Sequence, residues 1–201
     1  MHYLAQLGLP MDVVEGLPGG FVDHWDARVR HLPDHQRLIR LNDTGRCGPY
    51  LAAVCHGLPD LIAIKHLDVP RVLVLHADLQ GRMVQEGCSL SLKDMQYTVR
   101  AYLRMVGGVA VATSRRNLVS WGVEGRIIEM PASLDHVKDV RWTIRQMPTD
   151  PEPSATMAEE GRRKVHDRFS EAQFVERWRA AIHEARDRHR QLFQRSSALA
   201  H

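Results

Sequence analysis

The chain has 201 residues, of which 44% are hydrophobic and 25% are charged, and its formal net charge is +3. This composition is typical of a soluble globular protein long enough to bury a core, and the mild charge gives no reason to expect a nucleic-acid partner. No apolar run reaches the roughly 18 residues that a membrane-spanning helix needs, and the first eight residues do not resemble a secretory signal.

The three cysteines are Cys47, Cys55 and Cys88, and no two of them have the C-x-x-C spacing. The sequence therefore predicts neither a disulfide framework nor a structural zinc site, and no cofactor or metal is expected. Cys55 lies inside an apolar run and is predicted to be a small buried side chain. A reducing cytoplasm is the predicted location.

The first third of the chain carries weak signals. The pattern predicts a helix that ends at Gly8, a strand over 11–15, a weakly helical segment over 21–28, a strand over 37–40 and turns over 42–49. The segment 16–20 is rich in glycine but matches no phosphate-binding motif, so it is interpreted as a loop.

Three short apolar runs, at 50–56, 71–78 and 108–116, end abruptly in polar residues. A continuous apolar run of this length predicts a strand buried on both faces. Strands over 50–55, 71–76, 109–112 and 126–130 alternate with predicted helices over 59–65, 79–86, 92–106 and 115–121. This alternation predicts right-handed crossovers and an α/β fold with a Rossmann-like parallel sheet and flanking helices.

A proline-rich break over 148–153 precedes two predicted helices, one over 155–167 and one that begins at Ser170. Ser170 and Gln173 have the spacing of a capping box, and an apolar stripe runs from Phe174 to Ala185. We expect this C-terminal helical pair to pack on the sheet and the chain to fray from about residue 191. The predicted organisation is a Rossmann-like domain over 1–135, a linker over 136–153 and C-terminal helices over 154–201.

The candidate site residues follow the predicted strands, where open parallel sheets bind ligands. His56 and His76 come directly after two buried strands, so either imidazole could bind a substrate or act as a base, or could hydrogen-bond to backbone. Asp78 could orient His76, but the N-cap of the next helix is the favoured interpretation. Ser114, Arg115 and Arg116 open a later helix, where they could bind an anion or could be a cap and two solvated cations.

The order of segments resembles that of retaining glycosyltransferases of the GT-B fold. The resemblance rests on the strand and serine at 109–114, on the Trp-Gly segment and strand at 118–131, and on the strand that ends in His76. The segment 157–178 is similar to the last two helices of the same enzymes. The usual Pro-Gly-Val-Asp of the family is replaced by Pro131-Ala-Ser-Leu-Asp135.

The family places a whole nucleotide-sugar domain between these two matching regions, whereas here residues 136–153 alone join them. The first strand of the family's N-terminal domain, with its glycine-rich loop, is also without a counterpart. The resemblance implies an acceptor-side half-enzyme with His76 as the catalytic residue and with His56, Asp78, Ser114, Arg115 and Arg116 as substrate-binding residues.

Two functions follow from this resemblance. The chain is either a half-enzyme that takes a sugar or glycan acceptor and needs a partner chain for the nucleotide-sugar, or a non-catalytic relative that acts as a binding or scaffold protein. In the second case, loss of the donor domain exposes the cleft face, which favours a partner chain or a homodimer. A truncated or rearranged gene product is a third possibility. The sequence does not identify the sugar, the acceptor or the partner.

Overall fold

The computed structural model describes residues 4, 7–17, 25–26, 28, 31–85, 87–129, 159–160, 163 and 170–199. The strands are β1 (Met11–Glu15), β2 (Gln36–Arg40), β3 (Ala53–Cys55), β4 (Arg71–Leu75), β5 (Val109–Ala112) and β6 (Gly125–Ile127). The helices are η1 (Leu41–Asp43), α2 (Thr44–Cys47), α3 (Leu58–Ala63), α4 (Leu79–Gln85), α5 (Leu92–Met105), α6 (Arg115–Trp121) and α9 (Glu171–Leu199). The predicted α/β class is confirmed.

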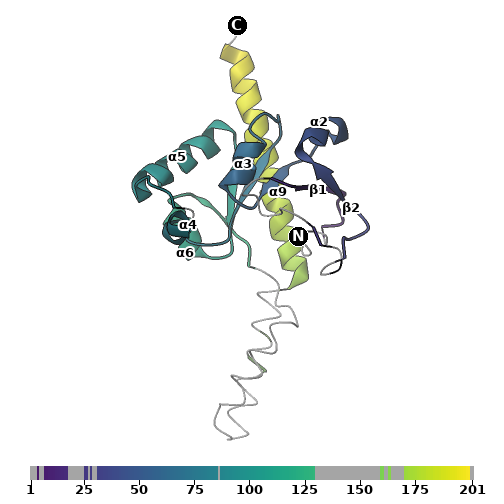
Figure 1. Cartoon of the computed structure of the whole chain (residues 1–201), viewed down its shortest axis with the longest axis horizontal. Coiled ribbons are helices and arrows are strands. Elements are labelled where there is room, and N and C mark those ends of the chain that lie inside the picture. Colours follow the sequence, from purple (N-terminus) through teal and green to yellow (C-terminus); the bar gives the residue numbers. More distant parts are fainter. Residues whose placement is uncertain are drawn as a thin grey trace, which may run out of the picture.

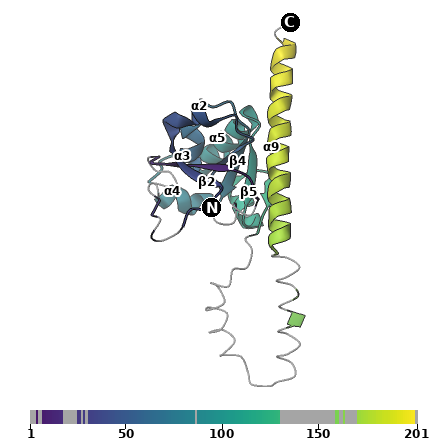
Figure 2. The same ribbon diagram turned by 90° about the vertical axis from the view of Figure 1, so that its right-hand side faces the viewer.

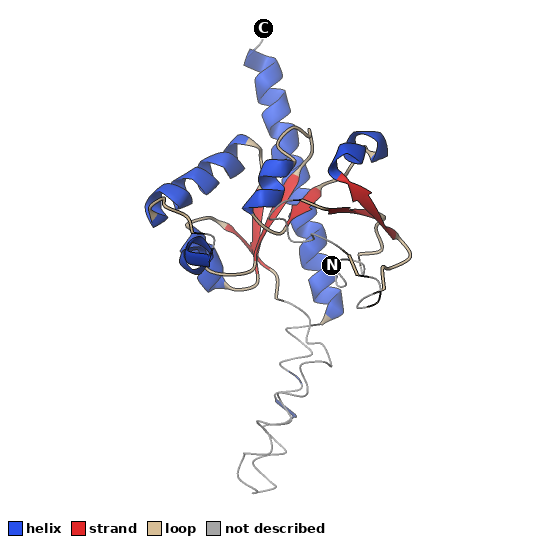
Figure 3. Cartoon of the chain, viewed as in Figure 1, coloured by secondary structure: helices blue, strands red, loops and turns tan. Residues whose placement is uncertain are grey.

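The described strands form two parallel sheets. The larger has the order β3-β4-β5-β6, and the smaller consists of β1 and β2 (Figures 1 and 3). Ala53 pairs with Arg71, Val72 with Val109, and Ala110 with Gly125, so neighbouring strands follow one another in the sequence. This arrangement requires the helical crossovers that the alternating pattern predicted.

Both faces of the larger sheet are covered. Leu73, Leu75, Ala110 and Ala112 point into a core with residues of α3, α4, α5 and α6. The alternate residues Val72, Val74, Val109 and Val111 point to the other face, where they pack against α9 and the segment around Leu4 and Leu7. Strands with two buried faces have no polar alternation, which is why the runs at 72–75 and 109–112 are continuously apolar.

Helix α9 covers one face of the sheet and extends beyond it at its C-terminal end (Figure 2). Its buried side chains recur at helical spacing, at Phe174, Trp178, Ala181 and Ala185. Ser170 Oγ accepts a hydrogen bond from the backbone N–H of Gln173 at 3.3 Å, as the predicted N-cap requires. The helix continues to Leu199, beyond the residue at which fraying was expected to begin.

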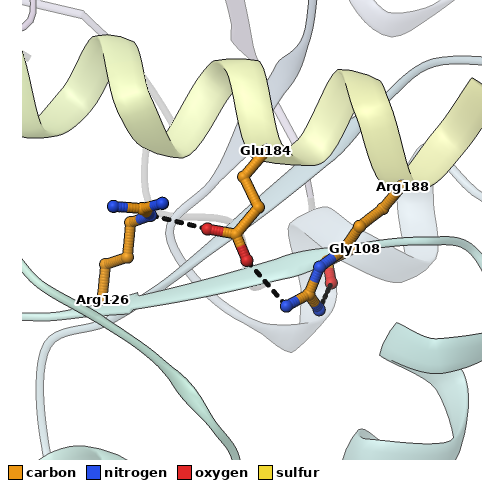
Figure 4. A network of polar contacts seen from close by, with 4 residues as sticks. All are labelled: Gly108, Arg126, Glu184 and Arg188. Atoms are coloured by element: carbon orange, nitrogen blue, oxygen red, sulfur yellow. Dashed lines mark hydrogen bonds and ion pairs between the residues drawn. The ribbon is translucent and has the colours of Figure 1, made fainter.

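A polar network fastens α9 to the sheet beside this apolar contact (Figure 4). Glu184 accepts hydrogen bonds from Arg126 of β6 at 2.6 Å and from Arg188 at 2.7 Å. Arg188 in turn donates to the carbonyl of Gly108, before β5, at 3.4 Å. These contacts set the position of the helix along the sheet.

Several boundaries differ from the predicted ones. Strand β3 begins at Ala53 rather than at residue 50, because the ladder with β4 would next need the N–H of residue 70, which is proline. Tyr50 instead hydrogen-bonds to the carboxylate of Asp12. Strand β6 covers Gly125–Ile127, starting one residue before the predicted strand and ending three residues earlier. The predicted turns at 42–49 contain the short helices η1 and α2. The strand over 109–112 and the helix over 115–121, which ends at Gly122, match their predictions.

Other predictions fall on residues outside the described ranges. These are most of the N-terminal helix, most of the segment 21–28, the linker 136–153 and most of the helix over 155–167. The structure therefore describes the second member of the predicted C-terminal helical pair. Within the described ranges, no helix combines the length and the apolar character needed to cross a bilayer.

Candidate functional site

His56 and His76 lie against each other at the carboxyl edge of the larger sheet. His56 follows β3 and His76 follows the neighbouring parallel strand β4. The Nδ1 atom of His56 is 2.8 Å from the Nε2 atom of His76, and the ring planes differ by 12°. The structure thus brings together the two histidines that the sequence placed at neighbouring strand ends.

The surroundings of this pair favour neutral imidazoles. Burial, together with the neighbouring His76 ring, lowers the pKa of His56 from 6.5 to about 3. Partial burial also lowers the pKa of His76. At neutral pH the bond between the rings therefore joins two uncharged groups, one donating and the other accepting.

Two charged residues flank the pair, and the sequence analysis did not identify either of them. The carboxylate of Asp60, in α3, accepts a hydrogen bond from the backbone N–H of His56 at 2.8 Å. Arg82, in α4, lies near Gly57, the residue after His56, where its Nη2 atom would be 3.3 Å from an added Cβ, and its charge contributes to the lowered pKa of His76. Asp60 lies in the first turn of the predicted helix over 59–65, four residues after His56. An acidic residue at that position is the sequence signal that could have indicated this contact.

The loop that carries His76 is held in place by α6. The buried Asn117 side chain donates to the carbonyl of Leu75 at 3.2 Å, and Trp121 Nε1 donates to the carbonyl of Ala77 at 2.8 Å. Ser120 Oγ accepts from the backbone N–H of Leu79 at 2.7 Å. These bonds fix the backbone on both sides of His76 and so pre-organise the imidazole.

Asp78 and Ser114 both cap helices. Asp78 Oδ1 accepts from the backbone N–H of Gly81 at 2.8 Å at the start of α4, as the favoured interpretation predicted. Ser114 Oγ accepts from the backbone N–H of Asn117 at 3.3 Å at the start of α6. The side chains of both residues therefore have a structural role at the same sheet edge as the histidine pair.

Arg115 and Arg116 are exposed in the first turn of α6. The contacts of the described residues include no hydrogen bond or ion pair from either guanidinium to the histidine pair. Helix α6 has seven residues and its first turn is already capped by Ser114. The arrangement matches the interpretation in which the two arginines are solvated surface cations.

A second polar cluster, which the sequence did not indicate, joins β1 and β2 to the start of β3. Asp12 accepts hydrogen bonds from Arg37, one of them 2.9 Å long, and from the hydroxyl of Tyr50 at 2.8 Å. The bond from Arg37 lowers the pKa of Asp12, while burial and the bond to Asp12 raise the pKa of Tyr50. A cavity of about 430 Å³ opens beside this cluster and is also lined by Gln36.

Within the described ranges, no group of three or more histidine, cysteine or acidic side chains has the arrangement of a metal site. The comparisons with known proteins give no family: no family model matches the sequence, and no curated protein or solved structure matches the chain.

Proposed function

We propose that the chain is the acceptor-side half of a glycosyltransferase-like enzyme and binds a hydroxyl group of its sugar acceptor at the His56–His76 pair. The observation that carries the proposal is the 2.8 Å contact between these two imidazoles at the carboxyl edge of a parallel sheet. Such edges are where open α/β sheets place their ligands.

The chemistry of the pair suits a hydroxyl ligand. Two neutral imidazoles carry one N–H each, and one of these lies in the bond between the rings. Sugar hydroxyls both donate and accept hydrogen bonds, so they are chemically compatible with a neutral imidazole pair, and the Asp60 carboxylate lies beside it, bonded to the backbone N–H of His56.

The requirement for a partner chain rests on the length of one connection. Residues 128–170 join β6 to α9, whereas an independent domain typically has about 50 residues or more. A nucleotide-sugar domain of the kind seen in GT-B enzymes does not fit in that stretch. The donor site of the proposed enzyme therefore lies outside the stretch between β6 and α9, and we propose that a partner chain supplies it.

One observation favours a non-catalytic carbohydrate-binding protein as the second candidate. General-base catalysis works best with a pKa near the working pH, and the pKa of His56 is lowered to about 3. His56 is therefore a weak base at neutral pH, and the pair is better suited to holding a hydroxyl than to removing its proton.

Calorimetric titration of the full chain with a panel of mono- and disaccharides tests the proposal. We expect saturable binding of at least one sugar, and a loss of about tenfold or more in affinity in His76→Ala. His183→Ala is the matched control, because His183 is exposed on α9, and its affinity should equal that of the unmodified chain. No binding by any sugar, or equal loss in both variants, would contradict the assignment.

A second titration, with nucleotide-sugars, separates the two candidates. A half-enzyme alone should bind no nucleotide-sugar, but should transfer sugar once a donor-side partner is added. Saturable binding of a nucleotide-sugar by the isolated chain would contradict the proposal that the donor site is on a partner chain. Sugar binding without transfer in the presence of any partner would support the non-catalytic protein.

A further inference from the structure

A cavity of about 390 Å³ separates the two sheets, and its lining has an unusual pattern. The lining includes the consecutive residues 9–14, which lead into and through most of β1, and the consecutive residues 49–56 around β3. Successive side chains of a strand point to opposite faces, so a cavity above one face is lined by alternate residues. Here neighbouring residues of each strand all line the cavity, so the cavity lies beside the edges of β1 and β3, in the plane of the sheets.

The backbone of both strands presents hydrogen-bonding groups to this slot. The N–H of Met11 donates toward β2, to the carbonyl of His35 at 3.0 Å, and the N–H of Ala53 donates toward β4, to the carbonyl of Pro70 at 2.8 Å. Alternate residues of a strand direct their N–H and C=O groups to opposite sides. Asp12, Val14 and Val54 therefore direct theirs into the slot.

These groups have no strand to pair with in the described part of the chain, where β1 is hydrogen-bonded to β2 and β3 to β4. Exposed strand edges readily hydrogen-bond to a further strand. Because two such edges face each other across the gap, one inserted strand could hydrogen-bond to both of them.

Both faces of the slot are apolar. On one side, Met11, Val54 and Ile182 belong to the core beneath α9. On the other side, Cys55, Ile64 and Leu67 belong to the core on the face covered by α3 to α6. A strand in this position is covered on both faces, so apolar side chains are favoured at every position rather than at alternate ones.

We infer that the slot between β1 and β3 binds an extended, continuously apolar peptide strand of about five residues, the length of β1 and β4, supplied by a partner polypeptide. The added strand pairs with both edges and unites the sheets in the order β2-β1-added strand-β3-β4-β5-β6. The Tyr50–Asp12 bond holds the amino ends of β1 and β3 at one end of the slot. A parallel added strand therefore ends beside His56. This inference does not depend on the carbohydrate ligand.

The experiment uses the full chain and a fluorescein-labelled probe peptide, Lys-Lys-Val-Ile-Val-Val-Ile-Lys-Lys. Fluorescence anisotropy should show saturable binding. A peptide with proline in place of the central valine, which lacks one backbone N–H, should bind about tenfold more weakly. Amide exchange measured by NMR should slow at Asp12, Val14 and Val54 when the first peptide is added, while Ala53, already bonded to β4, should change little.

Two variants at one position test the role of the backbone. Val54→Pro removes an N–H that faces the slot and leaves the β4 ladder intact, so it should weaken binding of the first peptide about tenfold. Val54→Thr keeps that N–H and a β-branched side chain, so binding should stay within about twofold.

Three results would overturn the inference. They are no saturable binding at about 1 mM peptide, equal binding of the two peptides, or binding without slower exchange at Asp12, Val14 and Val54. The second and third would identify a site for apolar molecules in general. The exchange measurement uses the unmodified chain, so it decides the question even if Val54→Pro does not fold.

Discussion

The Nδ1 atom of His56 lies 2.8 Å from the Nε2 atom of His76, so two imidazoles from neighbouring strands share one hydrogen bond. A shared bond of this kind needs one donor and one acceptor, and it is lost when both rings are protonated. Protonation of the pair is therefore coupled to the stability of the sheet edge that carries it.

The first prediction concerns acid stability. The pKa of His56 is about 3 in the folded chain and 6.5 ordinarily, so between these values the unfolded chain binds more protons than the folded one. The free energy of unfolding should therefore fall as pH drops below about 6.5. Urea denaturation should show that titration of His56 lowers the free energy of unfolding by about 1–2 kcal/mol between pH 7.5 and pH 5.

The control for this prediction is a comparison of two histidine variants. His56→Gln should flatten the pH profile by that amount, because the titrating group is gone, whereas His183→Gln on the exposed face of α9 should leave the slope unchanged. An identical slope in His56→Gln and the unmodified chain would show that His56 titrates normally.

The second prediction concerns thiol reactivity. Burial raises the pKa of Cys55 to about 12, while Cys47 and Cys88 are partly exposed. The thiolate is the reactive form, so Ellman's reagent at pH 8 should modify two thiols in the folded chain and all three in urea. Cys55→Ser should leave the number of rapidly reacting thiols unchanged. Rapid modification of a third thiol in the folded chain would be inconsistent with a buried Cys55.

The third prediction concerns the close approach of α9 to Gly107, the residue two before β5. A Cβ on Gly107 would lie 3.0 Å from the backbone of Arg188 and His189, and Gly107 has a φ of +62°. Gly87 has the same φ, but a Cβ there would meet nothing within 4 Å. Gly87→Ala should cost about 1–2 kcal/mol from backbone strain alone.

Gly107→Ala should cost at least about 1 kcal/mol more than Gly87→Ala, because α9 must shift to accommodate the methyl group. Urea denaturation of both variants measures the difference. If both variants lose the same free energy of unfolding, α9 can shift without destabilising the fold, and its contact with Gly107 contributes little to stability.

The fourth prediction ranks the contacts that hold α9. Trp178 is 4% exposed in the core, so Trp178→Ala should destabilise the fold by about 3–5 kcal/mol. Glu184 bridges Arg126 and Arg188 but is partly exposed, so Glu184→Ala should cost less than about 1 kcal/mol. Chemical denaturation checks both values, and a larger cost for Glu184→Ala would reverse the ranking.

The fold was predictable where the pattern is local. The runs over 72–75 and 109–112 are apolar at every position, and Ser114 and Gly122 mark the two ends of the helix over 115–121. These signals depend on neighbours in sequence. The boundary of β3 was missed because it depends on the register with β4, which places Pro70 where the ladder would continue, and local patterns do not give that register.

The candidate site was predictable in part for the same reason. His56 and His76 follow consecutive parallel strands, which pair side by side, so their meeting follows from a general rule of the fold. The position of Arg82 near Gly57 depends on how α4 is rotated, which its sequence does not specify. The slot between β1 and β3 depends on strand order, and no local pattern encodes that.

The position of α9 in the chain has a consequence for synthesis. The sheet face formed by Val72, Val74, Val109 and Val111 is covered by α9, which is the last described element in sequence. A ribosome adding about 5–20 residues per second releases β3 to β6 several seconds before that helix. During this interval the nascent chain presents an uncovered valine-rich surface, and this surface is where we expect a chaperone to bind.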